Sequence, residues 1–175
     1  FHYHPGNNYH ITLHATASIH NESDNFEYIY EPTEEDSDMT FDSGRYTKNF
    51  DGEKITGNAL GFSLNKRTRT DNFGVVLRLR SPGFRTSNGF ERNNATKWLK
   101  ASRGKTVFYD NNPILLKTDY GISTTYKTNY SGLIKEQELS LSTSSDLRNG
   151  DFFKVSAEFE KENFRGYQFD NLYEF

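Results

Sequence analysis

Residues 114–130, ILLKTDYGISTTYKTNY, decide the fold class. Every second residue from Ile114 to Tyr130 is aliphatic, aromatic or Thr, whereas the intervening positions are mostly Lys, Asp, Gly, Ser, Thr and Asn. A two-residue period is typical of a β-strand whose two faces meet different surroundings. Such a strand extends about 55 Å at about 3.3 Å per residue, which is longer than the strands of soluble sandwiches. The segment therefore favours a tilted membrane strand that extends into an outer loop.

The same alternation recurs on both sides of this segment. It covers residues 9–20, 60–65, 73–80, 153–160 and 167–175, and it is weaker near 139–144. Residues 95–109 fit either a short helix closed by Gly104 or a strand beginning near Trp98, and we favour the strand. We predict an all-β, up-and-down antiparallel fold of about eight main strands in a single domain, residues 1–175. Short turns alternate with longer polar loops, which we expect near residues 21–52 and 81–94.

Composition narrows the functional classes. The chain has 175 residues, of which 33% are hydrophobic and 15% aromatic, so it is expected to fold as one domain. The formal net charge of −3 argues against a nucleic-acid partner. Cysteine is absent, which excludes disulfides and thiolate chemistry. The chain begins with Phe1 and no targeting segment follows, so we expect either an excised piece or a mature exported protein.

Two folds fit the alternation. A soluble β-sandwich or jelly roll places its apolar faces inside, whereas a small transmembrane barrel turns them toward lipid and fills its interior with polar side chains. Strand length, the expected alternation of turns and loops, and aromatic residues near strand ends favour the barrel, whereas the mean hydropathy of −0.87 favours the sandwich. In a barrel we expect an interior polar network formed by His10, His14, Arg78, Arg80, Asp119 and Glu158.

Three segments resemble small outer-membrane barrels typified by outer-membrane protein X, the attachment-invasion proteins and the opacity proteins. Residues 61–80 resemble the second strand, inner turn and third strand of that group, and residues 146–160 resemble its last inner turn and seventh strand. The terminal strand is similar to the one by which such proteins are recognised for membrane assembly, and it carries Tyr167, Phe169, Tyr173 and the final Phe175. The resemblance implies a bacterial outer-membrane location and a role in adhesion or resistance to host defence.

Candidate sites are few. We expect the outer loops to meet a host surface protein or glycan, with an acidic cluster among the contacts: Glu31, Glu34, Glu35, Asp36 and Asp38. The spacing of these acids lacks the pattern of a calcium loop. The histidines of residues 10–20 are too spread for one metal ion, so we predict no metal and no cofactor. We also expect no enzymatic activity, the enzymatic alternative being a lipid-modifying barrel. The non-membrane alternative is a secreted or cell-surface sandwich that binds carbohydrate or acts as an adhesin.

Overall fold

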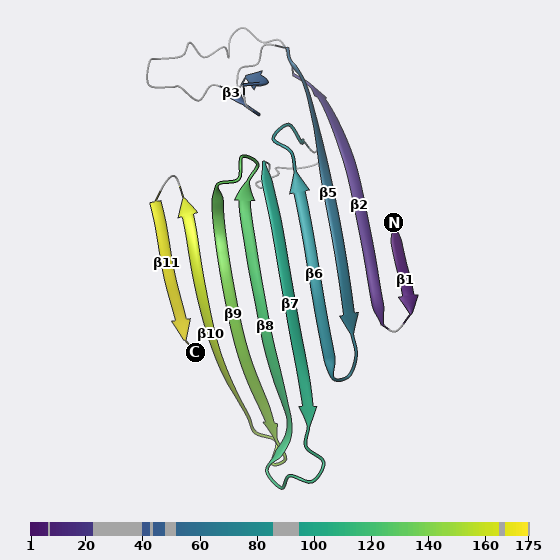
Figure 1. Ribbon diagram of the computed structural model, residues 1–175, viewed down its shortest axis with the longest axis vertical. Helices are drawn as coiled ribbons and strands as arrows, with labels where there is room; N and C mark the ends of the chain where they lie inside the picture. The colour runs from purple at the N-terminus through teal and green to yellow at the C-terminus, as the bar shows by residue number, and fades with distance from the viewer. Residues whose placement is uncertain are drawn as a thin grey trace.

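The computed structural model describes residues 1–6, 8–22, 40–42, 44–47, 52–85, 95–164 and 167–174. In these residues the secondary structure is entirely β, and one antiparallel sheet dominates it (Figure 1). The described residues hold no helix with the length and apolar character needed to cross a bilayer. The expected all-β class is therefore confirmed.

The sheet has nine strands in the order β1-β2-β5-β6-β7-β8-β9-β10-β11, and every neighbouring pair is antiparallel. A small hairpin of β3 and β4 forms a second sheet. The up-and-down prediction is confirmed, since eight longer strands follow one another and the short β1 adds to one edge. The strands are β1 (His2–Gly6), β2 (Tyr9–Asn21), β3 (Thr40–Phe41), β4 (Tyr46–Thr47), β5 (Lys54–Arg67), β6 (Asp71–Arg80), β7 (Thr96–Phe108), β8 (Leu115–Asn129), β9 (Ile134–Leu147), β10 (Phe152–Phe164) and β11 (Tyr167–Glu174).

Two expected elements are resolved by this arrangement. The decisive segment forms β8, which has 15 residues and is the longest strand of the sheet. The ambiguous segment at 95–109 forms β7, as favoured, and its 13 residues pair with both β6 and β8. Two strand neighbours satisfy the backbone hydrogen bonds of this segment, which a surface helix would have satisfied internally.

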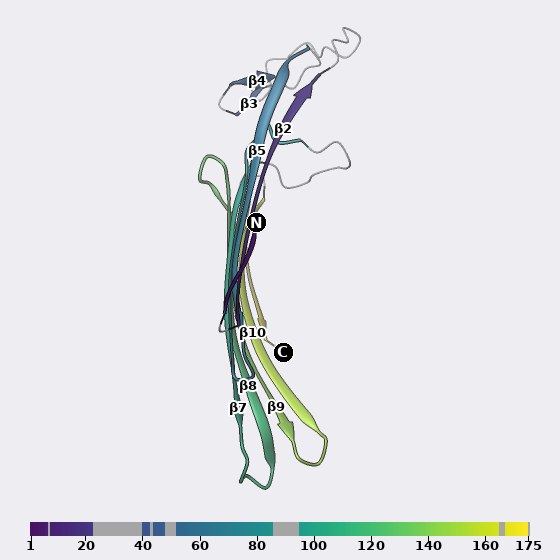
Figure 2. The same ribbon diagram turned by 90° about the vertical axis from the view of Figure 1, so that its right-hand side faces the viewer.

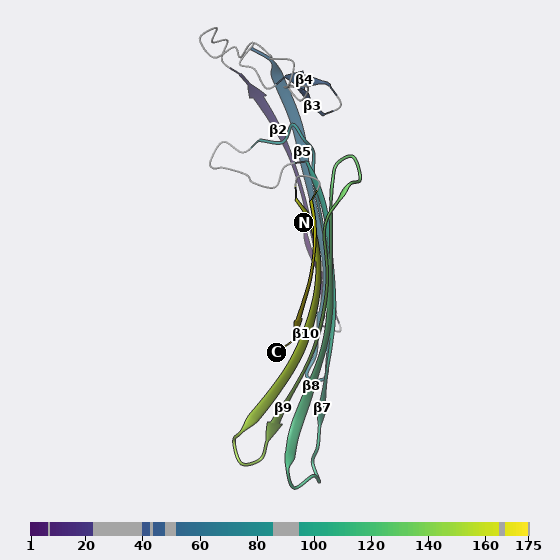
Figure 3. The same ribbon diagram turned by 90° about the vertical axis from the view of Figure 1, so that its left-hand side faces the viewer.

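The sheet is one curved layer. Edge-on views show a thin, bent sheet with no second sheet stacked on it over the described residues (Figures 2 and 3). β1 and β11 lie at opposite edges, and within the described ranges no ladder joins them. β1 pairs only with the first part of β2, where His2 lies opposite Thr12 and Gly6 opposite Tyr9. The second half of β2 therefore presents an edge with no strand beside it in the described part of the chain.

The connections at the two ends of the sheet differ. At one end β5–β6, β7–β8 and β9–β10 are joined by short turns. The Asn112 side chain organises one of these turns by accepting hydrogen bonds from the backbone N–H groups of Ile114 and Leu115, both at 2.9 Å. At the other end β2–β5 and β6–β7 have long connections, as predicted, but β8–β9 and β10–β11 have short ones. The expected alternation of short turns and long loops thus holds only for the first half of the chain.

A small apolar core lies at the long-loop end. Among the described residues, the buried hydrophobic side chains are Tyr46, Ile55 and Phe84. The Tyr46 hydroxyl bonds to the Thr56 side chain at 3.0 Å and accepts the Thr56 N–H at 3.1 Å, and these hydrogen bonds lower the pKa of the phenol. The backbone N–H of Arg85 donates to the Ser18 hydroxyl at 3.0 Å. These contacts fix the bases of both long connections to the strands β2 and β5.

The molecule as a whole exposes more surface than a compact protein. Its accessible surface is 12743 Å², whereas the scaling law for compact monomers gives about 8,800 Å² at this mass. Much of the excess comes from large apolar side chains that a second layer would normally cover. The uncovered surface is therefore the main feature that an account of function must explain.

Candidate functional site

The strand register collects the apolar side chains on one side of the sheet, here called the apolar face. Register partners share a face, so a row across the sheet runs from Leu13 through Phe62, Leu77 and Leu99 to Tyr126. Neighbouring rows of the apolar face add further large side chains: Ile11, Leu64, Val75, Ile122, Leu139, Leu141, Val155 and Phe159. The apolar face is thus continuous from β2 to β10.

Exposure is inverted relative to a soluble protein. On β8, Ile122 is 48% exposed and Tyr126 is 39% exposed, whereas Thr125 between them is only 4% exposed. The sheet therefore curves around the side that carries Thr125, because curvature crowds side chains on the inner side. On β9 and β10 the apolar Leu141 and Phe159 remain 41% and 47% exposed. Polar side chains line the concave side here, and apolar ones line the convex side.

The opposite side, here called the polar face, carries both signs of charge. The residues expected to form an interior network lie on it together, in the register of the sheet: His10, His14, Arg78, Arg80, Asp119 and Glu158. Cationic side chains gather on β6, β7 and β8, and anionic ones on β9 and β10. The structure does not bring Arg78 into contact with Glu158, since three strands lie between theirs.

A bridged cluster on the polar face lies near the short-turn end. The Lys117 ammonium is 2.9 Å from Asp119 and 3.2 Å from Asp146. The Thr106 hydroxyl also donates a hydrogen bond to Asp119. Asp119 was expected in the polar network, but the bridging role of Lys117 becomes visible only once β8 and β9 are paired.

A basic and aromatic hollow lies nearer the other end of the polar face. Its volume is about 230 Å³ and it is lined by Arg78, Arg80, Thr96, Trp98 and Lys127. The Arg78 guanidinium carbon is 4.9 Å from the centre of the Trp98 ring, within the range of a cation–π contact. Sequence reasoning missed Trp98 and Lys127 as parts of this cluster, because three strands contribute to it and alternation does not reveal which strands are neighbours.

Acidic side chains face one another across β9 and β10. Register places Glu138 opposite Glu160 and Glu136 opposite Glu162. Like charges directly opposite destabilise a strand pair. Lys127 lies 3.5 Å from Glu136 and offsets part of this charge. An uncompensated acidic patch therefore remains along β10 on the polar face.

The histidines form pairs between β1 and β2. The ring centres of His4 and His10 are 4.5 Å apart, and those of His2 and His14 are 5.5 Å apart. No group of three or more metal-ligating side chains occurs in the described residues. The sequence did not reveal these pairs, because the hairpin between β1 and β2 was not anticipated.

The terminal strand pairs with β10 in an informative register. Tyr167, Phe169 and Tyr173 lie opposite Phe164, Glu162 and Glu158. These aromatic positions are thus in phase with the polar positions of β10 and out of phase with Phe159. Phe175 lies outside the described residues, as do the acidic loop candidates Glu31, Glu34, Glu35, Asp36 and Asp38.

Comparisons of the chain with protein-family models, curated proteins and solved structures found no match.

Proposed function

We propose that this protein is an integral outer-membrane β-barrel whose loops at the long-connection end mediate adhesion or host interaction. The observation that carries the proposal is the inverted exposure of the sheet. Apolar side chains line its convex side and polar ones its concave side, which is the arrangement of a membrane barrel. Lipid would cover the apolar face without a second protein layer.

Strand length supports this proposal. A tilted transmembrane strand needs about 9–11 residues. β7, β8, β9 and β10 have 13, 15, 14 and 13 residues, so each is long enough to cross a bilayer and extend beyond it. Closure would bring β11 to the free edge of β2, which leaves no long edge exposed to other chains.

Charge placement supports closure as well. In a ring of eight strands, strands four positions apart face each other across the interior, and β6 and β10 stand in that relation. Closure would direct Arg78 and Arg80 of β6 toward the acidic patch of β10. An eight-stranded barrel has an interior just wide enough to be filled by side chains, so these groups can pair there. The interior would then be a compensated network and not an open channel.

The loop role rests on the contrast between the two ends of the sheet. Binding residues are concentrated on loops that a rigid scaffold positions. The long connections depart from β2, β5 and β6 at the same end, and the core of Tyr46, Ile55 and Phe84 anchors their bases. The expected partner is a host surface protein or glycan.

Refolding tests the barrel. We expect urea-unfolded protein to regain β-structure in detergent or phospholipid vesicles, and to aggregate in plain buffer. Leu139→Arg should prevent refolding into vesicles, because Arg near the bilayer midplane costs about 2–4 kcal/mol on the lipid-facing side. Its neighbour on the polar face provides the matched control, Ser140→Arg, which should still refold. Monodisperse, folded protein in plain buffer would instead support the soluble sandwich adhesin.

Adhesion requires its own test. Bacteria displaying the protein should bind cultured host cells, and replacing residues 86–94 with a Gly-Ser linker of equal length should abolish the gain. Replacing Ser131 and Gly132 of the short β8–β9 connection with the same linker is the control and should leave adhesion intact. Equal surface amounts with equal adhesion in all three strains would contradict the loop role while leaving the barrel standing.

A further inference from the structure

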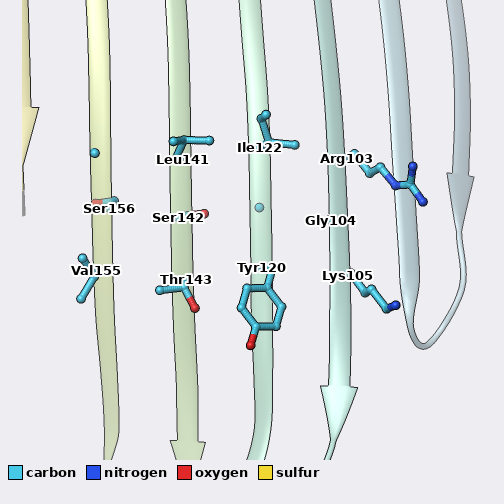
Figure 4. Close-up of a pocket in the computed structure, with 12 residues that line it drawn as sticks. Arg103, Gly104, Lys105, Tyr120, Ile122, Leu141, Ser142, Thr143, Val155 and Ser156 are labelled. Atoms are coloured by element: carbon cyan, nitrogen blue, oxygen red, sulfur yellow. The ribbon is translucent and has the colours of Figure 1, made fainter.

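A hollow on the apolar face interrupts the row of large side chains. Its volume is about 440 Å³, within the range of about 300–1,000 Å³ typical of small-ligand sites. Figure 4 shows its side chains on four adjacent strands, β7 to β10. The floor is low because Gly104 and Gly121 are register partners, and neither has a side chain to fill the space. The walls are mainly apolar: Tyr120, Ile122, Leu141, Val155 and Ala157.

Two cations form the β7 side of this hollow. The aliphatic parts of Arg103 and Lys105 line it, and Figure 4 shows their charged ends directed away from β8 and toward β6. Neither forms an ion pair with any residue that the structure describes. In register with Arg103 lie Phe73 on β6 and then Lys66 on β5. The hollow thus ends in a small basic area built on an apolar surface.

One acid lies near the basic area. Asp71 is the register partner of Lys105, and its carboxylate accepts a hydrogen bond from the Thr70 hydroxyl at 3.0 Å. Lys66, Arg103 and Lys105 together outweigh this single negative charge. The area is therefore complementary to an anion, and Arg103 can present two parallel N–H donors to phosphate oxygens.

We propose that the hollow binds one anionic phospholipid, with an acyl chain over Gly104 and Gly121 and the phosphate beside Arg103 and Lys105. This proposal rests on the proposed membrane function and names a lipid class for that surface. The apolar walls favour hydrocarbon, and the cations at one end favour a negative headgroup, so a single amphiphile satisfies both. A free phosphate ion would use the cations and leave the hollow empty.

Native mass spectrometry of the full-length protein in detergent micelles tests the proposal. We expect one phosphatidylglycerol molecule to remain bound per protein, and phosphatidylcholine to bind at least tenfold more weakly. Near a membrane surface each basic residue contributes about fivefold to the binding of anionic lipid. The double variant Arg103→Gln/Lys105→Gln should therefore weaken phosphatidylglycerol binding by about 30-fold, whereas Asp71→Asn should strengthen it.

Matched variants separate the hollow from general surface charge. Lys97→Gln/Lys161→Gln removes two cations from the apolar face away from the hollow, and phosphatidylglycerol binding should change less than twofold. Ala157→Leu adds bulk to the hollow without changing charge and should weaken binding of the lipid, but not of inorganic phosphate. Equal losses in both double variants would overturn the proposal, as would competition of millimolar inorganic phosphate with the lipid.

The result is separable from that of the proposed function. Protein that folds only with detergent but retains phosphatidylglycerol and phosphatidylcholine equally would overturn the lipid site alone. Protein that is folded and monodisperse in plain buffer would overturn the membrane function and, with it, this site.

Discussion

At the residue scale, two small side-chain groups stabilise a molecule whose apolar face is largely uncovered. One is the core at the long-loop end, and the other is the ion cluster around Lys117. Both depend on close approach between strands, so single substitutions there have consequences that differ from those on the open faces of the sheet. The two predictions at this scale concern these groups.

Gly57→Ala should loosen the bases of the long connections. A Cβ atom at this position would lie 2.2 Å from the backbone nitrogen of Phe84, so the segment carrying Phe84 must move. Overpacking of this kind costs about 1–3 kcal/mol. Limited proteolysis should then cleave near residues 81–85 faster than in the wild type. Gly61→Ala is the control, because its Cβ would meet only the His14 Cβ at 3.8 Å. Equal cleavage rates in the two variants would contradict the role assigned to Gly57.

Lys117→Met should destabilise the short-turn end of the polar face. It removes the cation between Asp119 and Asp146 and leaves two carboxylates near each other. The three side chains are between 32% and 40% exposed, so solvent screening limits the loss to about 1 kcal/mol. Urea-dependent unfolding in detergent measures this free energy. Lys154→Met, which removes a cation that has no ion pair in the described residues, should cost less. A larger cost for Lys154→Met would argue against the bridge.

At the element scale, the register of β11 is the least intuitive feature. Its aromatic positions Tyr167, Phe169 and Tyr173 are in phase with the glutamates of β10, whereas a lipid-facing terminal strand would place them in phase with Phe159. Because side chains alternate, a slip of one residue would exchange the two faces of β11. The register therefore decides which residues of this strand line a closed interior.

Disulfide trapping tests this register, and the absence of native cysteine makes the experiment clean. In the described register, Glu158→Cys/Tyr173→Cys places two cysteines directly opposite each other, with Cβ atoms about 4.5–5.5 Å apart. We expect this pair to cross-link readily under mild oxidation. The slipped pair, Phe159→Cys/Tyr173→Cys, should remain reduced. Preferential cross-linking of the slipped pair would show that the aromatic residues continue the apolar face.

The elements differ in how far the sequence predicts them. β8 and β10 follow from alternation alone, since their two phases differ sharply in polarity. β7 was ambiguous because Lys97, Arg103 and Lys105 occupy its apolar phase, which weakens the periodic signal. β1 and its histidine pairs were missed because five residues carry too little pattern. The network around Lys117 and Trp98 depends on which strands are neighbours, and one-dimensional periodicity does not contain that information.

At the scale of the whole molecule, the central question is how a single curved layer satisfies its two faces. Lipid satisfies the apolar face, and closure satisfies the polar face by bringing β6 opposite β10. Both conditions follow from one geometry, and this unity distinguishes a barrel from a sheet that merely binds a partner on one side. The remaining two predictions test closure through energy and through distance.

Charge reversal tests closure through energy. Arg78→Glu and Glu158→Arg should each destabilise the protein in vesicles, and the double variant should recover about 1 kcal/mol or more relative to the sum. In the open sheet the two residues lie four strand spacings apart, about 19 Å, and no coupling is expected. A cycle with Arg78→Glu and Lys154→Glu provides the control, because two cations gain nothing from mutual reversal. Additive effects for Arg78 and Glu158 would argue against an interior pair.

Closure can also be measured as a distance between the two edges of the sheet. Spin labels at Ala17 on β2 and Leu172 on β11 are separated by seven strand spacings in the open sheet, or about 34 Å. In a closed barrel these strands are neighbours, so the backbones approach to about 5 Å laterally and the label distance falls below about 20 Å, allowing for stagger along the strands. Labels at Ala17 and Asn58, which are register partners, give the short reference distance in either case. Pulsed electron resonance on protein in detergent should report the short distance for the β2–β11 pair, because an open sheet leaves the backbone edges of both strands unpaired in a medium without water. A distribution centred near 34 Å in detergent and in vesicles would contradict the barrel, even if the protein partitions with membranes.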